Sequence, residues 1–238
     1  MARHVAERFR PESTSPHNYD RGVDATSGST IADRHGIRER AVALTFDDGP
    51  SEWTEPILDL LREQGARATF FVLGNALPGR EEIVRRILAE GSELGNHSYT
   101  HRRLTTLADA EIRFELEATQ EAIRAIAPVH VRFWRPPHFG YDERVLGVAC
   151  ELGLRELVRC SIDPADYRST ADEIVARVLS KLEPGSIVDL HDGRPAGEPP
   201  EASAPTREAT VDAVRVLLAS LQKAGYSALT LSELLAAA

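Results

Sequence analysis

The chain has 238 residues, of which 42% are hydrophobic and 27% are charged, as in an ordinary globular domain. Its 37 acidic and 28 basic residues give a formal net charge of −9 at pH 7. This balance argues against nucleic acid or an anionic membrane as a partner, because both attract basic surfaces. No segment has the roughly 20 apolar residues of a membrane span. Three arginines near the start precede no apolar stretch, so we expect no secretory signal and, for a full-length chain, a cytoplasmic protein.

The chain divides into a polar beginning and a patterned remainder. Residues 1–38 are expected to form a poorly ordered arm, since 12–36 are rich in Ser, Thr, Pro, Gly and Asp without apolar periodicity. Residues 39–238 are predicted to form a single domain. The predicted strands are 41–46, 68–73, 92–96, 131–134, 154–158, 186–190 and 227–230. The predicted helices are 54–64, 79–90, 109–126, 142–151, 170–182, 206–224 and 232–237, and glycines at 65, 91, 153 and 225 are expected to cap helices.

The repeated alternation of strand and helix predicts a parallel sheet covered by helices. About seven strands fit either an incomplete or distorted barrel or an open doubly wound sheet. No Gly-x-Gly-x-x-Gly follows the first strand, so a dinucleotide site has no support. In both architectures the residues at the carboxyl ends of the strands face the functional site.

Polar residues follow the first and third predicted strands. Asp47 and Asp48 lie in Thr-Phe-Asp-Asp-Gly-Pro, where the Gly-Pro turn can bring two neighbouring carboxylates to one site; a solvated turn is the alternative. His97 and His101 are four residues apart and share one face if the backbone coils there. Two imidazoles and the Asp48 carboxylate would leave a coordination position open, as in a catalytic rather than a structural zinc site.

The later strand ends carry further ionisable residues. Arg135 begins Arg-Pro-Pro-His-Phe-Gly and is expected to hold a carboxylate with a bidentate fork, with a structural ion pair as the alternative. Asp166 and Tyr167 follow the fifth predicted strand, in Ser-Ile-Asp-Pro-Ala-Asp-Tyr. His191 stands at the tip of the sixth strand beside carboxylates, which favours proton transfer over a buried structural histidine.

The order of these motifs resembles that of the polysaccharide deacetylases, the NodB-homology proteins of carbohydrate esterase family four. Thr-Phe-Asp-Asp-Gly-Pro, His-x-x-x-His, Arg-Pro-Pro, Asp-x-x-Asp-aromatic and Leu-His-Asp follow one another with similar spacing over residues 41–231. The resemblance implies an α/β fold, a distorted (β/α) barrel of about seven parallel strands. It also implies that 39–238 is a catalytic domain, a metal-dependent hydrolase that removes an N-acetyl group from an amino sugar or a related small amide.

The resemblance further implies a role for each matching residue. Asp47 would be the catalytic base, positioned by Arg135, and His191 the general acid, tuned by Asp166. The ligands of a divalent metal, zinc before cobalt, nickel or manganese, would be Asp48, His97 and His101. The residues that contact the substrate would be Pro137, Phe139, Tyr167 and Leu190.

Three positions depart from the family pattern. Tyr167 stands where the family usually has Trp, which would alter the acetyl pocket. His138 and Phe139 make the third motif one residue longer, so its backbone donor to the oxyanion is left unassigned. Asp189 replaces an aliphatic residue, and for it we expect only a hydrogen-bonded structural role.

Two other functions stay open at this point. The same metal site can serve a deformylase or another amidohydrolase of a small or cyclic amide, and release of formate instead of acetate would distinguish it. A carbohydrate-binding pseudoenzyme would be expected to lack a ligand or the base, yet none of these residues is missing from the sequence. A purely structural zinc site is disfavoured because three ligands leave the coordination shell open.

Overall fold

The computed structural model describes residues 30–32, 37 and 39–237. Its strands form one eight-stranded sheet in the order β1–β6–β5–β4–β3–β2–β7, with β8 paired to β2, and all the pairs are parallel. The strands are β1 (Thr30–Ala32), β2 (Ala41–Asp47), β3 (Thr69–Val72), β4 (Glu93–Asn96), β5 (Phe133–Trp134), β6 (Glu156–Val158), β7 (Ile187–His191) and β8 (Ser227–Leu229). The helices are α1 (Thr54–Glu63), α2 (Glu81–Ala89), α3 (Asp109–Ile126), α4 (Glu143–Glu151), α5 (Ala171–Lys181), α6 (Glu208–Lys223) and α7 (Leu231–Ala236).

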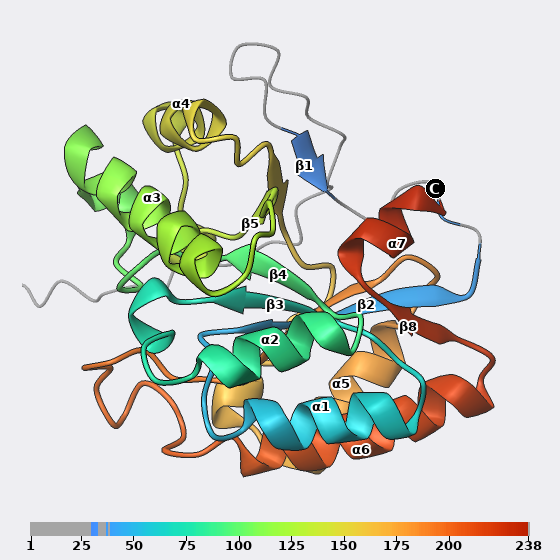
Figure 1. Cartoon of the computed structure of the whole chain (residues 1–238). Coiled ribbons are helices and arrows are strands. Elements are labelled where there is room, and N and C mark those ends of the chain that lie inside the picture. Colours follow the sequence, from blue (N-terminus) through green and yellow to red (C-terminus); the bar gives the residue numbers. More distant parts are fainter. Residues whose placement is uncertain (1–29, 33–36, 38, 238) are drawn as a thin grey trace, which may run out of the picture.

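The sheet curls into a distorted barrel. The segment after β6 closes it, because Ile162 forms a parallel bridge with Val188 of β7. Outside the sheet, the helices contact one another in the order α5–α6–α1–α2–α3–α4 and so follow the strands around the barrel (Figure 1). This architecture confirms the predicted fold class.

The two faces of each strand are buried in different surroundings. In β2, the residues Val42, Leu44 and Phe46 belong to the large core shared with the helices. Their neighbours Ala41 and Ala43 pack instead in a smaller core inside the barrel, which also contains Leu231 and Leu234 of α7. Successive side chains of a strand point to opposite faces, so the residues two apart from Ala43, namely Thr45 and then Asp47, also point into the barrel.

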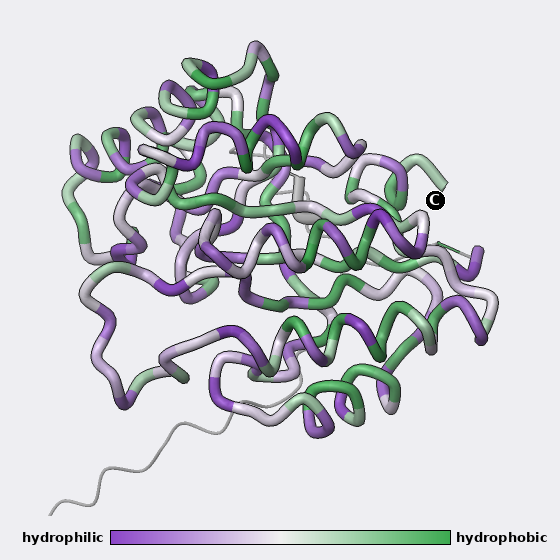
Figure 2. The backbone as a smooth tube through the Cα atoms, turned by 60° about the horizontal axis from the view of Figure 1, so that its bottom comes forward, coloured by the Kyte–Doolittle hydropathy of each residue, from purple (hydrophilic) through white to green (hydrophobic). Residues whose placement is uncertain are grey.

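The helices are amphipathic, as their sequence pattern predicts. Hydrophobic and hydrophilic residues alternate along each coil with the helical period (Figure 2). The glycines at 65, 91, 153 and 225 all have positive φ at helix ends, which confirms the predicted caps. Among the described residues, no helix combines the length and apolar character that crossing a membrane requires.

One element lies where no regular structure was expected. Strand β1 falls within the predicted arm and pairs with β6, Thr30 opposite Glu156 and Ala32 opposite Val158. A three-residue strand at a sheet edge needs only backbone hydrogen bonds, so it leaves little trace in composition. The rest of the predicted arm, apart from Ile37, lies outside the described residues.

Candidate active site

A cavity of about 330 Å³ lies at the carboxyl ends of the strands, where the predicted site residues were expected to meet. The predicted residues that line it are Asp47, Asp48, His97, His101, Arg135, Phe139, Tyr167 and His191. The other residues of its lining are Pro136, His138, Asp163, Asp189, Glu198, Ala202 and Arg207. Residues from five separate motifs therefore face one enclosed space.

Asp48, His97 and His101 form a compact group on one side of this cavity. The Nε2 atoms of His97 and His101 lie 3.5 and 3.3 Å from Oδ1 of Asp48. The Nδ1 atom of His97 donates to the carbonyl oxygen of Arg135 at 2.7 Å, which leaves its Nε2 as the nitrogen with a free lone pair. One oxygen and two nitrogens thus converge, with all three ligand atoms within 4.8 Å of one another.

This group fits a divalent cation. Oδ1 of Asp48 is buried and has no hydrogen-bond partner among the described residues. Burial raises the pKa of Asp48 well above its ordinary value, although His191 and Arg207 oppose the shift, so charges in the protein compensate the carboxylate only in part. Burial also lowers the pKa of His97 to about 3 and that of His101 to about 2, which keeps both imidazoles in the neutral form that binds metals.

A loop between the two histidines, rather than a turn of helix, brings them together. Ser98 and His101 have φ values of 69° and 63°, so the histidine rings meet across a left-handed bend, with centroids 5.1 Å apart. Buried Glu115 of α3 fixes this bend. Its Oε2 accepts from the backbone N–H groups of Tyr99 (2.9 Å) and Thr100 (2.7 Å), and its Oε1 accepts from the Thr100 hydroxyl.

Arg135 joins two carboxylates at the floor of the cavity. Its Nη1 atom donates to Oδ1 of Asp47 at 2.7 Å, to Oδ1 of Asp189 at 2.8 Å and to Oγ1 of Thr45 at 2.9 Å. Nη2 is buried without a partner among the described residues, and the guanidinium lies over the ring of Phe71 at 4.3 Å. The predicted bidentate fork is wrong: one nitrogen is divided between two carboxylates, because β7 places Asp189 opposite Thr45.

The sharing of Arg135 between Asp47 and Asp189 influences the pKa values of all three groups at the floor of the cavity. Burial raises the pKa of Asp189 to about 7, with the neighbouring Asp47 adding to the rise. Burial likewise raises the pKa of Asp47, although Arg135 opposes the shift. Burial alone would lower the pKa of Arg135, but Asp47 and Asp189 raise it, so the guanidinium keeps its charge. Asp47 is thus a carboxylate of increased basicity.

His191 and Asp166 form the second ionisable pair. Nδ1 of His191 lies 2.7 Å from Oδ1 of Asp166, while Oδ2 of Asp166 accepts from the His191 backbone N–H at 2.8 Å and from Thr210 at 2.7 Å. Burial opposes the charged imidazole, but Asp166 outweighs it and raises the pKa of His191 well above its ordinary value. The charge of His191, together with the three hydrogen bonds, lowers the pKa of Asp166 despite its burial. At neutral pH the pair therefore holds a proton on His191.

Comparison with known proteins agrees with this geometry. A family model for polysaccharide deacetylase matches residues 35–157. A chitooligosaccharide deacetylase of Bradyrhizobium sp. (strain ANU 289) is 39% identical over 199 residues, covering 82% of this chain and 90% of that protein. The chain belongs to the polysaccharide deacetylase family. The family predicted from the motifs is confirmed.

Other members of the family are also similar over most of their length. A peptidoglycan-N-acetylglucosamine deacetylase of Bacillus cereus is 35% identical, covering 81% of this chain and 67% of that protein. The crystal structure of the Bc1960 peptidoglycan N-acetylglucosamine deacetylase superposes with a TM-score of 0.77 and 32% identity, covering 86% of this chain and 92% of that one. The chain is therefore similar to deacetylases of this family both in sequence and in the fold of the barrel.

Two of the residues that the family resemblance assigned to the substrate do not line the cavity. Leu190 is fully buried and belongs to the core shared with the helices, because it lies on the opposite face of β7 from Asp189 and His191. Pro137 is buried as well, and Pro136 takes its place in the lining. For both residues, substrate contact stays a prediction that this geometry does not favour.

Three residues near the site have no catalytic or metal-binding role predicted from the sequence. For Asp189 the sequence predicts only a hydrogen-bonded structural role, although a period of two places it on the same face of β7 as His191. His138, with φ of 57°, places its ring 4.8 Å from that of His101. Glu115, which the motifs do not include, has a recognisable signal in the sequence: it stands three residues after Ile112 on the buried face of α3, where a charged residue needs a partner.

Proposed function

We propose that this member of the polysaccharide deacetylase family is a metal-dependent hydrolase that removes the N-acetyl group of an amino sugar. One observation carries the proposal: the Asp48–His97–His101 group lies in the same cavity as the Asp47–Arg135 contact and His191. The relatives act, by their names, on chitooligosaccharides and on peptidoglycan N-acetylglucosamine, and we propose an N-acetylated oligosaccharide of this kind as the substrate.

The proposed ligands of the metal are Asp48, His97 and His101, with zinc as the first candidate and cobalt, nickel or manganese as alternatives. A divalent cation held there would supply Lewis acidity, which lowers the pKa of water from 15.7 towards about 7. Asp47 would take the proton from the attacking water, since burial makes this carboxylate a stronger base than a solvated one. Arg135 would keep Asp47 oriented through its 2.7 Å hydrogen bond.

The second half of the reaction requires an acid. An amine leaves an amide carbon only when its nitrogen is protonated. Among the imidazoles that line the cavity, His191 is the one whose pKa is raised, so it holds a proton at neutral pH. Asp166 would keep His191 charged and oriented. The proton taken up by Asp47 and the proton given by His191 balance, so the products are acetate and a free amine.

The remaining residues would surround the acetyl group. Tyr167 packs edge-on against His191 with ring centroids 5.3 Å apart, and Phe139 faces the same cavity. In the lengthened third motif, the N–H groups of Phe139 and Gly140 already donate to Pro136 and Pro137. This leaves the N–H of His138 as the candidate donor to the oxyanion, a contact typically worth several kcal/mol.

The proposal is tested by measuring acetate release from chitooligosaccharides, peptidoglycan fragments, acetylated xylan and small N-acetylated metabolites, with and without a chelator, beside the metal content of the purified protein. We expect release that the chelator abolishes and that added zinc or cobalt restores. Release of formate from an N-formylated amino sugar, with no acetate from the acetylated substrates, would show a deformylase instead. Bound oligosaccharide without any release, in the presence of metal, would show a pseudoenzyme.

A further inference from the structure

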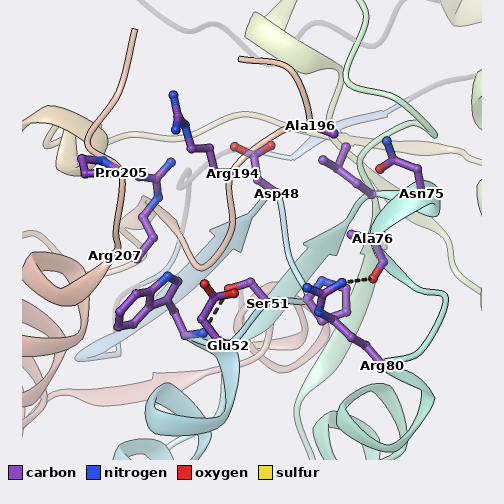
Figure 3. A pocket seen from close by; sticks show the side chains of 13 residues that line it. Asp48, Ser51, Glu52, Asn75, Ala76, Arg80, Arg194, Ala196, Pro205 and Arg207 are labelled. Atoms are coloured by element: carbon purple, nitrogen blue, oxygen red, sulfur yellow. Dashed lines mark hydrogen bonds between the residues drawn. The ribbon is translucent and has the colours of Figure 1, made fainter. Parts of the chain in front are cut away.

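A second cavity adjoins the catalytic one. It has a volume of about 290 Å³, and two of its lining residues, Asp48 and Arg207, also line the catalytic cavity. Arg194 and Arg207 lie on one side of it and Asn75 and Arg80 on the other (Figure 3). A substrate longer than one sugar can therefore extend from the catalytic cavity into this space.

Arg207 is the unusual member of this lining. Its side chain is only 2% exposed, yet it donates to backbone carbonyl oxygens alone: Gly193 at 2.8 Å, Ala204 at 2.9 Å and Thr206 at 3.3 Å. No described carboxylate lies within ion-pair distance of it. A buried charge without a counterion is costly in a protein that has no use for it.

On the other side of the cavity, Arg80, which is half-buried, also lacks a carboxylate partner among the described residues. It precedes α2 and makes one long hydrogen bond, to the carbonyl oxygen of Ala76 at 3.3 Å, and it too has no carboxylate within ion-pair distance in the described part of the chain. Arg194, by contrast, is paired with Glu198 at 3.1 Å. The cavity therefore presents two guanidinium groups that have no carboxylate within ion-pair distance among the described residues, although Arg207 lies near enough to Asp48 to lower its pKa.

The negative groups of the lining do not cancel this charge. The two carboxylates that line the cavity are Asp48 and Glu52. Asp48 belongs to the group that fits a cation, and Glu52 is exposed to solvent, where its charge is screened. Unpaired positive charge facing an enclosed space is notable in a chain whose formal net charge is −9.

We infer that this cavity is a subsite for a second sugar that carries an anionic substituent, next to the sugar whose acetyl group is removed. The unpaired cations Arg80 and Arg207 would receive a carboxylate or sulfate group, as guanidinium groups do in proteins. Trp53 and Asn75, which also line the cavity, offer the apolar face and the amide that a sugar ring and its hydroxyl groups require. This inference rests on the proposed deacetylase function and narrows its substrate class.

The test compares substrates that differ in charge alone. The probes are a peptide-free tetrasaccharide of alternating N-acetylglucosamine and N-acetylmuramic acid, the same tetrasaccharide with its carboxylates converted to methyl esters, and chitotetraose with and without 6-O-sulfate. Acetate release would give kcat/KM for each with the wild-type protein, Arg80→Gln and Arg85→Gln. Arg85 is the matched control, because it lies on α2, the helix that Arg80 precedes, but is paired with Glu82 and does not line the cavity.

We expect the acid to exceed its ester by about tenfold in kcat/KM, mainly through a lower KM. This ratio should fall towards one in Arg80→Gln, and with added salt, but not in Arg85→Gln. A higher kcat/KM for sulfated than for plain chitotetraose would show that the subsite accepts any anion of suitable size. Equal values for acid and ester, or a preference that Arg80→Gln leaves intact, would overturn the subsite. Absence of acetate from every probe in the presence of metal would instead overturn the proposed function.

Discussion

The two proton-handling pairs of the site are built in opposite ways. At Asp166–His191, one carboxylate serves one imidazole and receives three hydrogen bonds, so its charge is fully satisfied. At Asp47–Arg135, one guanidinium nitrogen is divided between two carboxylates, and its other terminal nitrogen has no partner among the described residues. Both pairs are buried, and both depend on neighbouring strands, since β2 places Asp47 opposite His191 of β7.

This difference gives Asp47 and His191 the unequal proton affinities that the proposed reaction needs. A satisfied carboxylate beside an imidazole stabilises the charged ring, so His191 is held as an acid. Asp47 shares the Arg135 guanidinium with Asp189, so the cation stabilises its charged form less and its pKa stays raised by burial. Asp47 is therefore suited to act as a base. Pairs of titratable groups whose environments push their pKa values apart are typical of acid–base sites. The following predictions concern substitutions that disrupt one of these two pairs, or that remove Glu115, which supports the bend carrying His101.

Replacing Asp47 with Asn should have the largest effect. The amide keeps the shape of the side chain and an acceptor for Arg135 but cannot take a proton, so we expect kcat to fall by about 10²–10⁴-fold. Metal content, measured by elemental analysis, should stay at the wild-type level. Asp48→Ala and His97→Ala should instead lose metal and activity together. Asp172→Asn, an exposed aspartate at the start of α5, is the control; full activity in Asp47→Asn would show that the base is elsewhere.

Breaking the acid pair should alter the pH profile. In Asp166→Asn the anion that raises the pKa of His191 is gone, and burial then lowers that pKa. His191 works in its protonated form and loses activity as pH rises through its pKa, so the alkaline limb of kcat/KM should move to lower pH. At pH 8 we expect a loss of about 10²-fold. An exposed histidine remote from the site, His130, offers the control variant His130→Asn, and an unmoved alkaline limb in Asp166→Asn would contradict the assignment of the acid.

The position of the site could be predicted from the sequence, because parallel strands bring their carboxyl ends to one edge and the polar motifs follow those ends. Alternation along β7 could also have separated Leu190 from the cavity and placed Asp189 in it. At Leu190 the family resemblance and the period of two predict opposite faces of β7, and the structure follows the period.

The contacts within the site could not be predicted in the same way. The division of Arg135 between Asp47 and Asp189 depends on the register of β2 against β7, which joins residues more than 140 positions apart in the sequence. The bend at His101 depends on a left-handed backbone that few residues other than glycine adopt, and on Glu115 from another element. Such non-local pairings are properties of the assembled sheet rather than of any one motif.

Replacing Glu115 should lower the affinity of the Asp48–His97–His101 group for metal without changing the Asp47–Arg135 or Asp166–His191 contacts. Glu115→Ala leaves the N–H groups of Tyr99 and Thr100 without their acceptor, so the bend that carries His101 loses its support. Partners behind metal ligands typically contribute about 10–100-fold in metal affinity. Competition with a chromophoric chelator should show a loss of this size in Glu115→Ala and a smaller one in Glu115→Gln, which keeps one acceptor. The control is the exposed Glu117→Ala on the same helix; equal affinity in all variants would contradict the role of Glu115.

The smallest effect is expected from Asp189→Leu. This substitution leaves the Asp47–Arg135 pair with one carboxylate for one cation, as in the Asp166–His191 pair. In Asp189→Leu, Arg135 has Asp47 as its sole carboxylate partner, and a neighbouring negative charge disappears; both changes lower the pKa of Asp47. Asp47 works in its ionised form, so the acidic limb of kcat/KM should move to lower pH, while kcat falls by about threefold because a weaker base takes the proton less readily. Asp189→Asn distinguishes charge from geometry, since it retains an acceptor for Nη1 without the charge. If the charge matters, Asn behaves like Leu; an unchanged acidic limb in both variants would show that dividing Arg135 does not set the basicity of Asp47.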